Sequence, residues 1–147
     1  CAPGGEVLAK VLVPLSKIAP EFTITQKIGE ETLGNEKFVK PYKADPLVHP
    51  KVSVLCALGG FGTGIALEKG TNEDNGRAKK IPCLLMHGTA DSVCSIEGSR
   101  RFAGHQNPEY FQMIEWPRYY HEIHNGGPNG LTGEEVILKA IKYIKGL

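Results

Sequence analysis

The sequence has no long apolar run and no excess of charge of one sign. Its longest unbroken apolar stretch is only a handful of residues, well short of a membrane-spanning helix. Lys and Arg together number 17 against 16 Asp and Glu, a formal net charge of +1, so no basic surface indicates a nucleic-acid partner. We therefore expect no binding of nucleic acid.

Cysteine is scarce, and its four copies show neither a CxxC pair nor zinc-ribbon spacing. They occur in apolar or mixed surroundings, which favours reduced thiols used as small hydrophobic residues in a cytosolic protein. The sequence also lacks an initiator Met, and Cys1–Gly5 has neither the basic start nor the apolar core of a signal peptide. We expect a cytoplasmic protein and a sequence cut from a longer chain.

The remaining composition is that of a folded protein, because 147 residues with 41% hydrophobic content suffice for one core. Glu6–Ile18 carries an apolar face at helical spacing, and Pro14 inside it predicts a kinked or two-part helix. Prolines and charges between residues 21 and 50 predict short helices and turns, with Lys37–Tyr42 as one candidate. Val52–Leu67 is apolar again but contains four glycines, which predicts a helix with a loose or closely packed glycine segment.

The C-terminal half predicts a parallel sheet. Ile81–Met86 is a short continuous apolar run, typical of a strand buried on both faces, and the turn residues His87–Asp91 end it. Ile96–Ala103 follows as a short helix and Tyr110–Trp116 as a second strand. Parallel strands joined by a helix indicate an α/β fold, whose functional loops lie at the carboxyl ends of the strands.

The last predicted element is a helix that follows the loop Pro117–Leu131. Thr132-Gly133-Glu134-Glu135 has the form of a capping box, with Thr132 as the N-cap and Glu135 at the third helical position. An apolar stripe follows, with lysines towards the end that the helix dipole favours.

Two residues that can carry chemistry follow the predicted strands. Asp91 comes a few residues after the first strand and His121 a few residues after the second. Both positions fall on the same edge of a parallel sheet, where a carboxylate can fix the tautomer of an imidazole and support proton transfer. The alternatives are an Asp that forms a turn or caps a helix, and a His that lies on the surface.

The wider sequence around these residues resembles the monoacylglycerol lipase and lysophospholipase branch of the α/β-hydrolases. Pro82–Asp91, Gly98-Ser99 and Tyr119–Asn125 are similar to the C-terminal signature of that branch. Lys43–His49 resembles a stretch of its helical cap, and Ala2-Pro3 resembles the short segment that leads into the cap. The resemblance covers essentially the whole chain, most specifically at the Asp and His motifs.

This resemblance implies that Asp91 is the acid and His121 the base of a Ser-Asp-His triad. The nucleophile of the family lies upstream in a G-x-S-x-G elbow, which none of the serines of this chain matches, and the upstream oxyanion-hole loop is also absent. The chain therefore corresponds to a C-terminal α/β-hydrolase portion, with a cap at residues 1–75 and a core segment at residues 76–147. It is expected to be inactive alone and to need the upstream segment that bears the Ser.

The resemblance further implies a lipid ester as substrate, a monoacylglycerol or a lysophospholipid, and peripheral membrane contact through the cap. Two other classes stay open. One is a non-catalytic α/β-hydrolase-like module that binds lipids or a partner. The other is a hydrolase of other esters or thioesters, or one with a Cys nucleophile, because one triad serves many substrates.

The remaining motifs predict no metal and no organic cofactor. His121-Glu122-Ile123-His124 is not HExxH, because Asn125 holds the position of the second His. Gly59–Gly64 misses the GxGxxG spacing, and no Gly-Lys-Ser or Gly-Lys-Thr follows it.

The side chains beside the proposed site are expected to be structural. Cys94, three residues after Asp91, is predicted to be a small buried filler, with a thiol whose modification blocks the pocket as the alternative. Trp116 and Tyr119-Tyr120 are predicted to pack the histidine loop, with substrate binding as the alternative.

Overall fold

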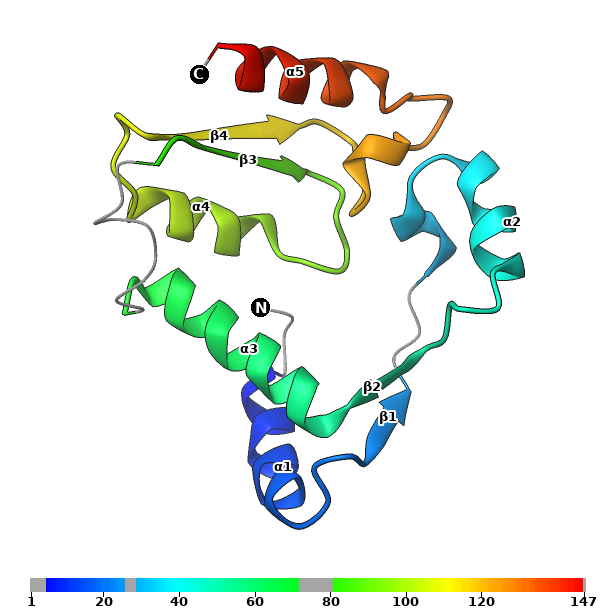
Figure 1. Ribbon diagram of the computed structural model, residues 1–147, viewed down its shortest axis with the longest axis vertical. Coiled ribbons are helices and arrows are strands. Elements are labelled where there is room, and N and C mark those ends of the chain that lie inside the picture. The colour runs from blue at the N-terminus through cyan, green and yellow to red at the C-terminus, as the bar shows by residue number, and fades with distance from the viewer. Residues whose placement is uncertain (1–4, 26–28, 72–80, 147) are drawn as a thin grey trace.

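Two parallel strands form the centre of the C-terminal part of the chain. The computed structural model describes residues 5–25, 29–71 and 81–146 (Figure 1). β3 (Cys83–Gly88) pairs with β4 (Phe111–Trp116) in a register that places Gly88 opposite Trp116. The carboxyl ends of the two strands therefore lie side by side, and the loops that follow them start from one edge.

Two helices, α4 (Ile96–Gly104) and α5 (Glu134–Lys145), lie on opposite sides of these strands (Figure 1). α4 supplies the crossover that a parallel pair requires. Its Phe102 packs edge-on against Phe111 of β4, with ring centroids 5.6 Å apart. α5 buries Val136 but exposes the other large apolar side chains that follow it, Ile137, Leu138, Ile141 and Ile144.

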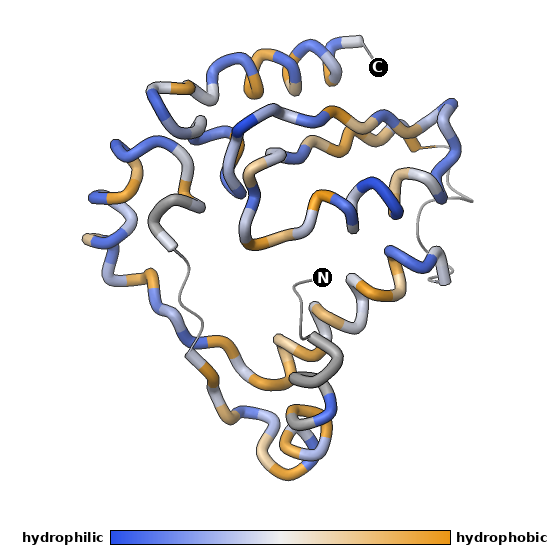
Figure 2. The backbone as a smooth tube through the Cα atoms, turned by 180° about the vertical axis from the view of Figure 1, so that it is seen from behind, coloured by the Kyte–Doolittle hydropathy of each residue, from blue (hydrophilic) through white to orange (hydrophobic). Residues whose placement is uncertain are grey.

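The N-terminal part consists of helices and a small antiparallel sheet. Its elements are α1 (Gly5–Ile18), β1 (Thr23–Thr25), the 3-10 helix η1 (Glu30–Leu33), α2 (Glu36–Ala44), β2 (Lys51–Ser53) and α3 (Val54–Lys69). β1 pairs with β2, and α1 packs against α3. Hydrophobic residues run along α3 and along β3 and β4 (Figure 2).

Polar side chains and one glycine set the ends of these helices. Asn35 caps α2 by accepting a hydrogen bond from the amide of Lys37, and Ser53 caps α3 by accepting one from the amide of Cys56. Gly70 ends α3 in the left-handed conformation, with φ of 63°, which glycine adopts without strain.

The end of α3 is attached to α4. Arg101 donates a hydrogen bond from Nη2 to Glu68 Oε2 at 2.7 Å, and His105 Nε2 lies 3.0 Å from the backbone oxygen of Glu68. Gly98 leaves room for the Glu68 side chain in this position, since a Cβ there would lie 2.7 Å from Glu68 Oε1. The N-terminal and C-terminal parts are therefore joined by side-chain contacts as well as by the chain.

The predicted elements of the C-terminal part are present with shifted ends. The prediction of a turn at His87 and Gly88 is wrong, because both residues belong to β3 and are buried. The predicted capping box is also wrong, because α5 takes Gly133 as its N-cap with no side-chain cap. A Cβ at Gly133 would lie 1.7 Å from the backbone oxygen of His124, so this close backbone approach fixes where the helix starts.

The helices of the N-terminal half lie close to where the sequence predicts them, whereas its strands were not predicted. α1 is one helix with Pro14 inside it, so the two-part alternative is wrong. The two short strands are not among the predicted elements, and Val52 belongs to β2 instead of the following helix. Of the two alternatives predicted for the glycine segment of α3, the loose one is confirmed at Gly59, Gly60 and Gly62, since nothing lies within 4 Å of a Cβ built there. The Ala2-Pro3 segment lies outside the described residues.

Among the helices of the described ranges, none is both long enough and apolar enough to cross a membrane.

Candidate active site

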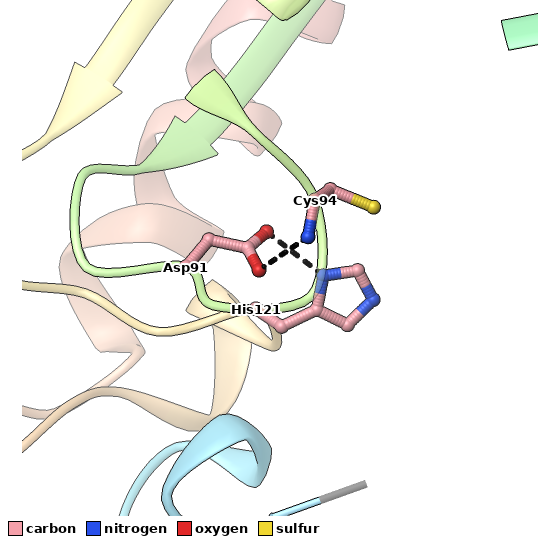
Figure 3. Close-up of side chains that lie close together, drawn as sticks. All are labelled: Asp91, Cys94 and His121. Carbon is pink, nitrogen blue, oxygen red and sulfur yellow. Dashed lines mark hydrogen bonds and ion pairs between the residues drawn. The ribbon is translucent and has the colours of Figure 1, made fainter. Parts of the chain in front are cut away.

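The acid and the imidazole predicted from the sequence meet at the carboxyl edge of β3 and β4. His121 Nδ1 lies 2.9 Å from Asp91 Oδ2 (Figure 3). Asp91 follows β3 in a turn in which its amide donates to the backbone oxygen of Gly88 at 3.1 Å. The structure therefore brings both predicted residues together in one hydrogen-bonded pair.

Backbone contacts between the two loops hold this pair in place. The amide of Thr89 donates to the backbone oxygen of Trp116, and the amide of Ala90 donates to that of Tyr119, both at 2.9 Å. Gly88 makes this approach possible, because a Cβ there would lie 2.3 Å from the oxygen of Tyr119. The loop after β3 that carries Asp91 is called the acid loop, and the loop after β4 that carries His121 is called the histidine loop. These two loops therefore form one unit at the sheet edge.

The Asp91 carboxylate is buried and receives donors at both oxygens. Oδ1 accepts hydrogen bonds from the amides of Val93 at 2.8 Å and Cys94 at 2.9 Å, and Oδ2 accepts one from His121. The Asp91 side chain is 4% exposed, whereas that of His121 is 39% exposed. Because an ionised carboxylate only accepts, Nδ1 carries the proton in neutral His121, and Nε2 keeps a lone pair.

Two opposing effects set the pKa of Asp91. Burial alone would raise the pKa of this carboxyl group. Hydrogen bonds from the Cys94 amide, the His121 ring and the Val93 amide favour the ionised form and outweigh the burial, so the pKa of Asp91 lies below its ordinary value. The acid is therefore a stable anion beside the imidazole.

A second histidine, His87, contacts the same carboxylate from within β3. Its Nε2 lies 3.3 Å from Asp91 Oδ2 and 3.2 Å from the backbone oxygen of Cys94, and its Nδ1 lies 2.8 Å from Ser99 Oγ. Both neighbours of Nε2 are acceptors, so Nε2 carries the proton in the neutral ring, and Ser99 donates its hydroxyl proton to Nδ1. The feature of the sequence that could have pointed to His87 is the His-Gly dipeptide at the end of the strand, which the sequence pattern alone assigns to a turn.

The comparison with known proteins assigns this chain to a family. The sequence model of the Hydrolase_4 family, described as serine aminopeptidase, S33, matches residues 3–127. The chain belongs to this family. It is a monoacylglycerol lipase-like α/β-hydrolase chain, and its fold is the C-terminal part of the α/β-hydrolase fold.

The chain spans about half the length of three lipases to which it is similar. A monoacylglycerol lipase of Mycolicibacterium smegmatis is 28% identical over 139 residues, which cover 94% of this chain and 48% of the relative. A solved monoacylglycerol lipase of Paleococcus ferrophilus is 26% identical with a TM-score of 0.75, over 93% of this chain and 51% of that one. A soluble variant of monoglyceride lipase from Saccharomyces cerevisiae, solved with a substrate analog, is 19% identical. It has a TM-score of 0.77, over 99% of this chain and 49% of that one, and shows the fold alone.

Cys94 of this hydrolase chain is not the buried filler that its residue type predicts. It is exposed and free, as are the other described cysteines, Cys56 and Cys83. Partial burial of the sulfur and the negative charge of Asp91 raise the pKa of the Cys94 thiol. The donor atoms of Asp91, Cys94 and His121 lie within 4.8 Å of one another, so these residues could hold a metal ion.

Of the three aromatic side chains predicted to pack the histidine loop, Trp116 and Tyr119 do so, whereas Tyr120 lines a cavity. Tyr119 is 5% exposed, and its ring meets that of Trp116 edge-on at 5.5 Å. The Tyr119 hydroxyl donates to the backbone oxygen of Thr132 at 2.8 Å, which connects the loop to the start of α5.

The N-terminal part of the family fold also supports this loop. The amide of Glu122 donates to the backbone oxygen of Thr32 at 3.2 Å, and the amide of Asn35 donates to that of Asn125 at 3.0 Å. A cavity of about 820 Å³ opens beside these contacts and is lined by residues of α2, Tyr120 and the loop after Asn125. Asp91 and His121 do not line it.

Proposed function

We propose that this chain is the C-terminal half of a carboxylic-ester hydrolase that acts on monoacylglycerols or lysophospholipids. In this proposal the Ser of a Ser-Asp-His triad lies on a segment upstream of residue 1. The observation that carries the proposal is the hydrogen bond of 2.9 Å between His121 Nδ1 and the buried Asp91 carboxylate. Membership of a serine hydrolase family and relatives named as monoacylglycerol lipases support it.

In the complete enzyme, His121 Nε2 would take the proton of the Ser hydroxyl as the oxygen attacks the ester carbonyl. The same proton then goes to the glycerol oxygen as it leaves. Asp91 holds the ring with Nε2 unprotonated and stabilises the imidazolium that forms. In serine proteases, loss of the aspartate that orients the triad histidine lowers kcat by about 10⁴-fold, and we expect a similar role for Asp91.

The large exposed surface area of the chain supports the proposal that a further segment packs against it. A compact protein of 16.0 kDa exposes about 7,400 Å² of surface by the general size scaling. This chain exposes 9952 Å². Within the described residues β3 and β4 pair only with each other, although parallel strands are usually buried in larger sheets. We therefore propose that the nucleophile-bearing segment covers these strands and α5, and that the chain alone is inactive.

We further propose that residues 1–75 form the cap and residues 76–147 the core segment. The cap would admit the acyl chain and make peripheral contact with a membrane, in a protein that is otherwise cytoplasmic. Its exposed apolar side chains support this contact, because Ile18 and Leu47 are each 84% exposed and Phe22 is 54% exposed.

The test uses the full-length protein and a fluorophosphonate probe, which labels an activated Ser. We expect one adduct on a mass well above 16.0 kDa, at a residue upstream of this chain. Labelling should be strongly reduced in His121→Ala and Asp91→Asn. The same three proteins are then assayed on monoacylglycerol, lysophospholipid, thioester and aminoacyl-amide substrates.

Three results would overturn the proposal. A folded full-length protein that takes up no probe is a non-catalytic module. A protein that cleaves the aminoacyl amides or thioesters and leaves both lipid esters intact is a hydrolase of another substrate class. Near-normal turnover in His121→Ala would remove the assigned base.

A further inference from the structure

Three side chains at the edge of the strands form a group of metal-ligand atoms. A carboxylate oxygen of Asp91, the sulfur of Cys94 and a ring nitrogen of His121 all lie within 4.8 Å of one another (Figure 3). Within the described ranges, this is the one group of three or more His, Cys, Asp and Glu side chains that meets this distance. The three residues come from the two loops that backbone hydrogen bonds join.

The donors match one class of cation. Thiolate sulfur, imidazole nitrogen and carboxylate oxygen are the ligands of Zn²⁺, whereas Ca²⁺ and Mg²⁺ take oxygen ligands almost exclusively. Ligand atoms around a tetrahedral Zn²⁺ are about 3.3–3.8 Å apart, as follows from its bond lengths of about 2.0–2.3 Å. The group therefore needs only a small inward movement of side chains to reach the geometry of a zinc site.

The surroundings hold the ligands ready and leave one position open. The amides of Val93 and Cys94 fix one oxygen of Asp91, as outer hydrogen bonds do for the ligands of zinc sites. Cys94 and His121 are exposed in this chain. A carboxylate and a thiolate together neutralise the two positive charges of the ion.

We propose that Asp91, Cys94 and His121 bind a divalent cation of the zinc class, and that this binding inhibits the enzyme. Binding takes the proton from the Cys94 thiol and releases it to solvent. If His121 binds through Nδ1, its ring proton moves to Nε2, which then cannot accept the proton of the nucleophile. If it binds through Nε2, the cation uses that lone pair directly. In both cases the base is lost, and a chelator restores it.

The inhibitory effect rests on the function proposed above, whereas the binding does not. The test therefore has a spectroscopic part and a kinetic part, both on the full-length protein. Cys94→Ser removes the thiolate, and Cys83→Ser is the matched control, because Cys83 is exposed, free and at the opposite end of β3. His121→Ala tests the second ligand.

The spectroscopic part titrates Cd²⁺ and follows the thiolate-to-metal charge-transfer absorption, then measures Zn²⁺ affinity by competition with a chromophoric chelator. We expect one equivalent of Cd²⁺ to produce this band in the wild type and in Cys83→Ser, and no such band in Cys94→Ser. The affinity for Zn²⁺ should fall about tenfold or more in Cys94→Ser and in His121→Ala. Equal Cd²⁺ bands and Zn²⁺ affinities in wild type and Cys94→Ser would overturn the site.

The kinetic part measures ester hydrolysis against Zn²⁺ concentration. With each variant measured against its own rate without metal, the half-inhibitory Zn²⁺ concentration of Cys94→Ser should rise about tenfold or more over wild type and Cys83→Ser. If the protein hydrolyses the esters but its metal binding does not depend on Cys94, the metal site is refuted and the proposed function stands. If metal binding depends on Cys94 but the protein hydrolyses none of the esters, the proposed function is refuted and the metal site stands.

Discussion

His87 Nε2 lies 3.3 Å from Asp91 Oδ2, the same oxygen that accepts the hydrogen bond from His121 Nδ1 at 2.9 Å. One buried carboxylate is thus placed between two imidazole rings, of which His87 is 8% exposed and His121 is open to solvent. Through Ser99, the inner ring connects the acid to α4. The position of the proposed base therefore depends on a side chain that sequence reasoning did not select.

Replacement of His87 tests this positioning role. His87→Leu removes a donor to Asp91 and leaves Ser99 and the Cys94 carbonyl without their partner, so stability should fall by about 1–3 kcal/mol. In the full-length enzyme kcat should fall about tenfold with little change in KM, because poorer orientation of the catalytic pair raises the activation free energy by about 1.4 kcal/mol. His87→Gln carries an amide donor near the position of Nε2 and should restore most of kcat. A His87→Gln variant as slow as His87→Leu would contradict the role of this hydrogen bond.

The lowered pKa of Asp91 predicts a specific dependence of stability on pH. Because the folded pKa lies below the ordinary value of 3.8, ionised Asp91 stabilises the fold above that value. This contribution is lost as pH falls through the folded pKa. Urea unfolding of wild type and Asp91→Asn between about pH 7 and pH 2 gives the free energy of unfolding of each protein. The difference between the two free energies, called the gap here, should be constant near neutrality and narrow in acid. A gap that widens as pH falls would mean that burial, and not hydrogen bonding, controls this carboxyl group.

Gly88→Ala should separate the acid loop from the histidine loop. The added Cβ would lie 2.3 Å from the backbone oxygen of Tyr119 and 2.4 Å from that of Tyr120, and backbone atoms cannot rotate away. We expect a loss of stability of about 1–3 kcal/mol, measured by thermal unfolding, together with a loss of ester hydrolysis. Gly104→Ala is the matched control, because nothing lies within 4 Å of its Cβ. An active Gly88→Ala enzyme would show that the two loops are not held as one unit.

Gly62→Ala should have the opposite effect on stability. Gly62 lies inside α3, and a Cβ there meets nothing within 4 Å. Alanine lowers the conformational entropy of the unfolded chain and should raise the free energy of unfolding by about 0.5–1 kcal/mol. Chemical denaturation of the two proteins measures this difference. A destabilised Gly62→Ala protein would indicate that another surface packs against this face of α3 in the full-length protein.

The elements that frame the site could be predicted from the sequence because their patterns are strong and local. The apolar run before His87 and the stripe of α5 each identify one element, and the order of elements places Asp91 and His121 on one edge. β1 was missed because it is three residues long and pairs with a strand more than twenty residues away. Such a pairing leaves no periodicity in a short stretch of sequence.

The errors near the site have a common physical cause, which is contact between distant backbone segments. Thr132 has the residues of a capping box around it, but the approach of Gly133 to His124 starts the helix one residue later. His87 precedes a glycine and resembles a turn residue, yet Gly88 serves the approach of the Tyr119 backbone and keeps β3 extended. Cys94 was predicted to be buried from its residue type alone, and the loop around Asp91 leaves it exposed.

Two backbone hydrogen bonds, from the amide of Glu122 to Thr32 and from the amide of Asn35 to Asn125, have a consequence for exchange of the proposed cap between relatives. A recombinant that brings a foreign sequence up to residue 50 also replaces the partners of Glu122 and Asn125. Such a chimaera is expected to need residues 29–35 and 121–126 from the same parent. Substitutions within α1 and α3 should therefore leave these two hydrogen bonds intact, whereas exchange of the whole proposed cap should not.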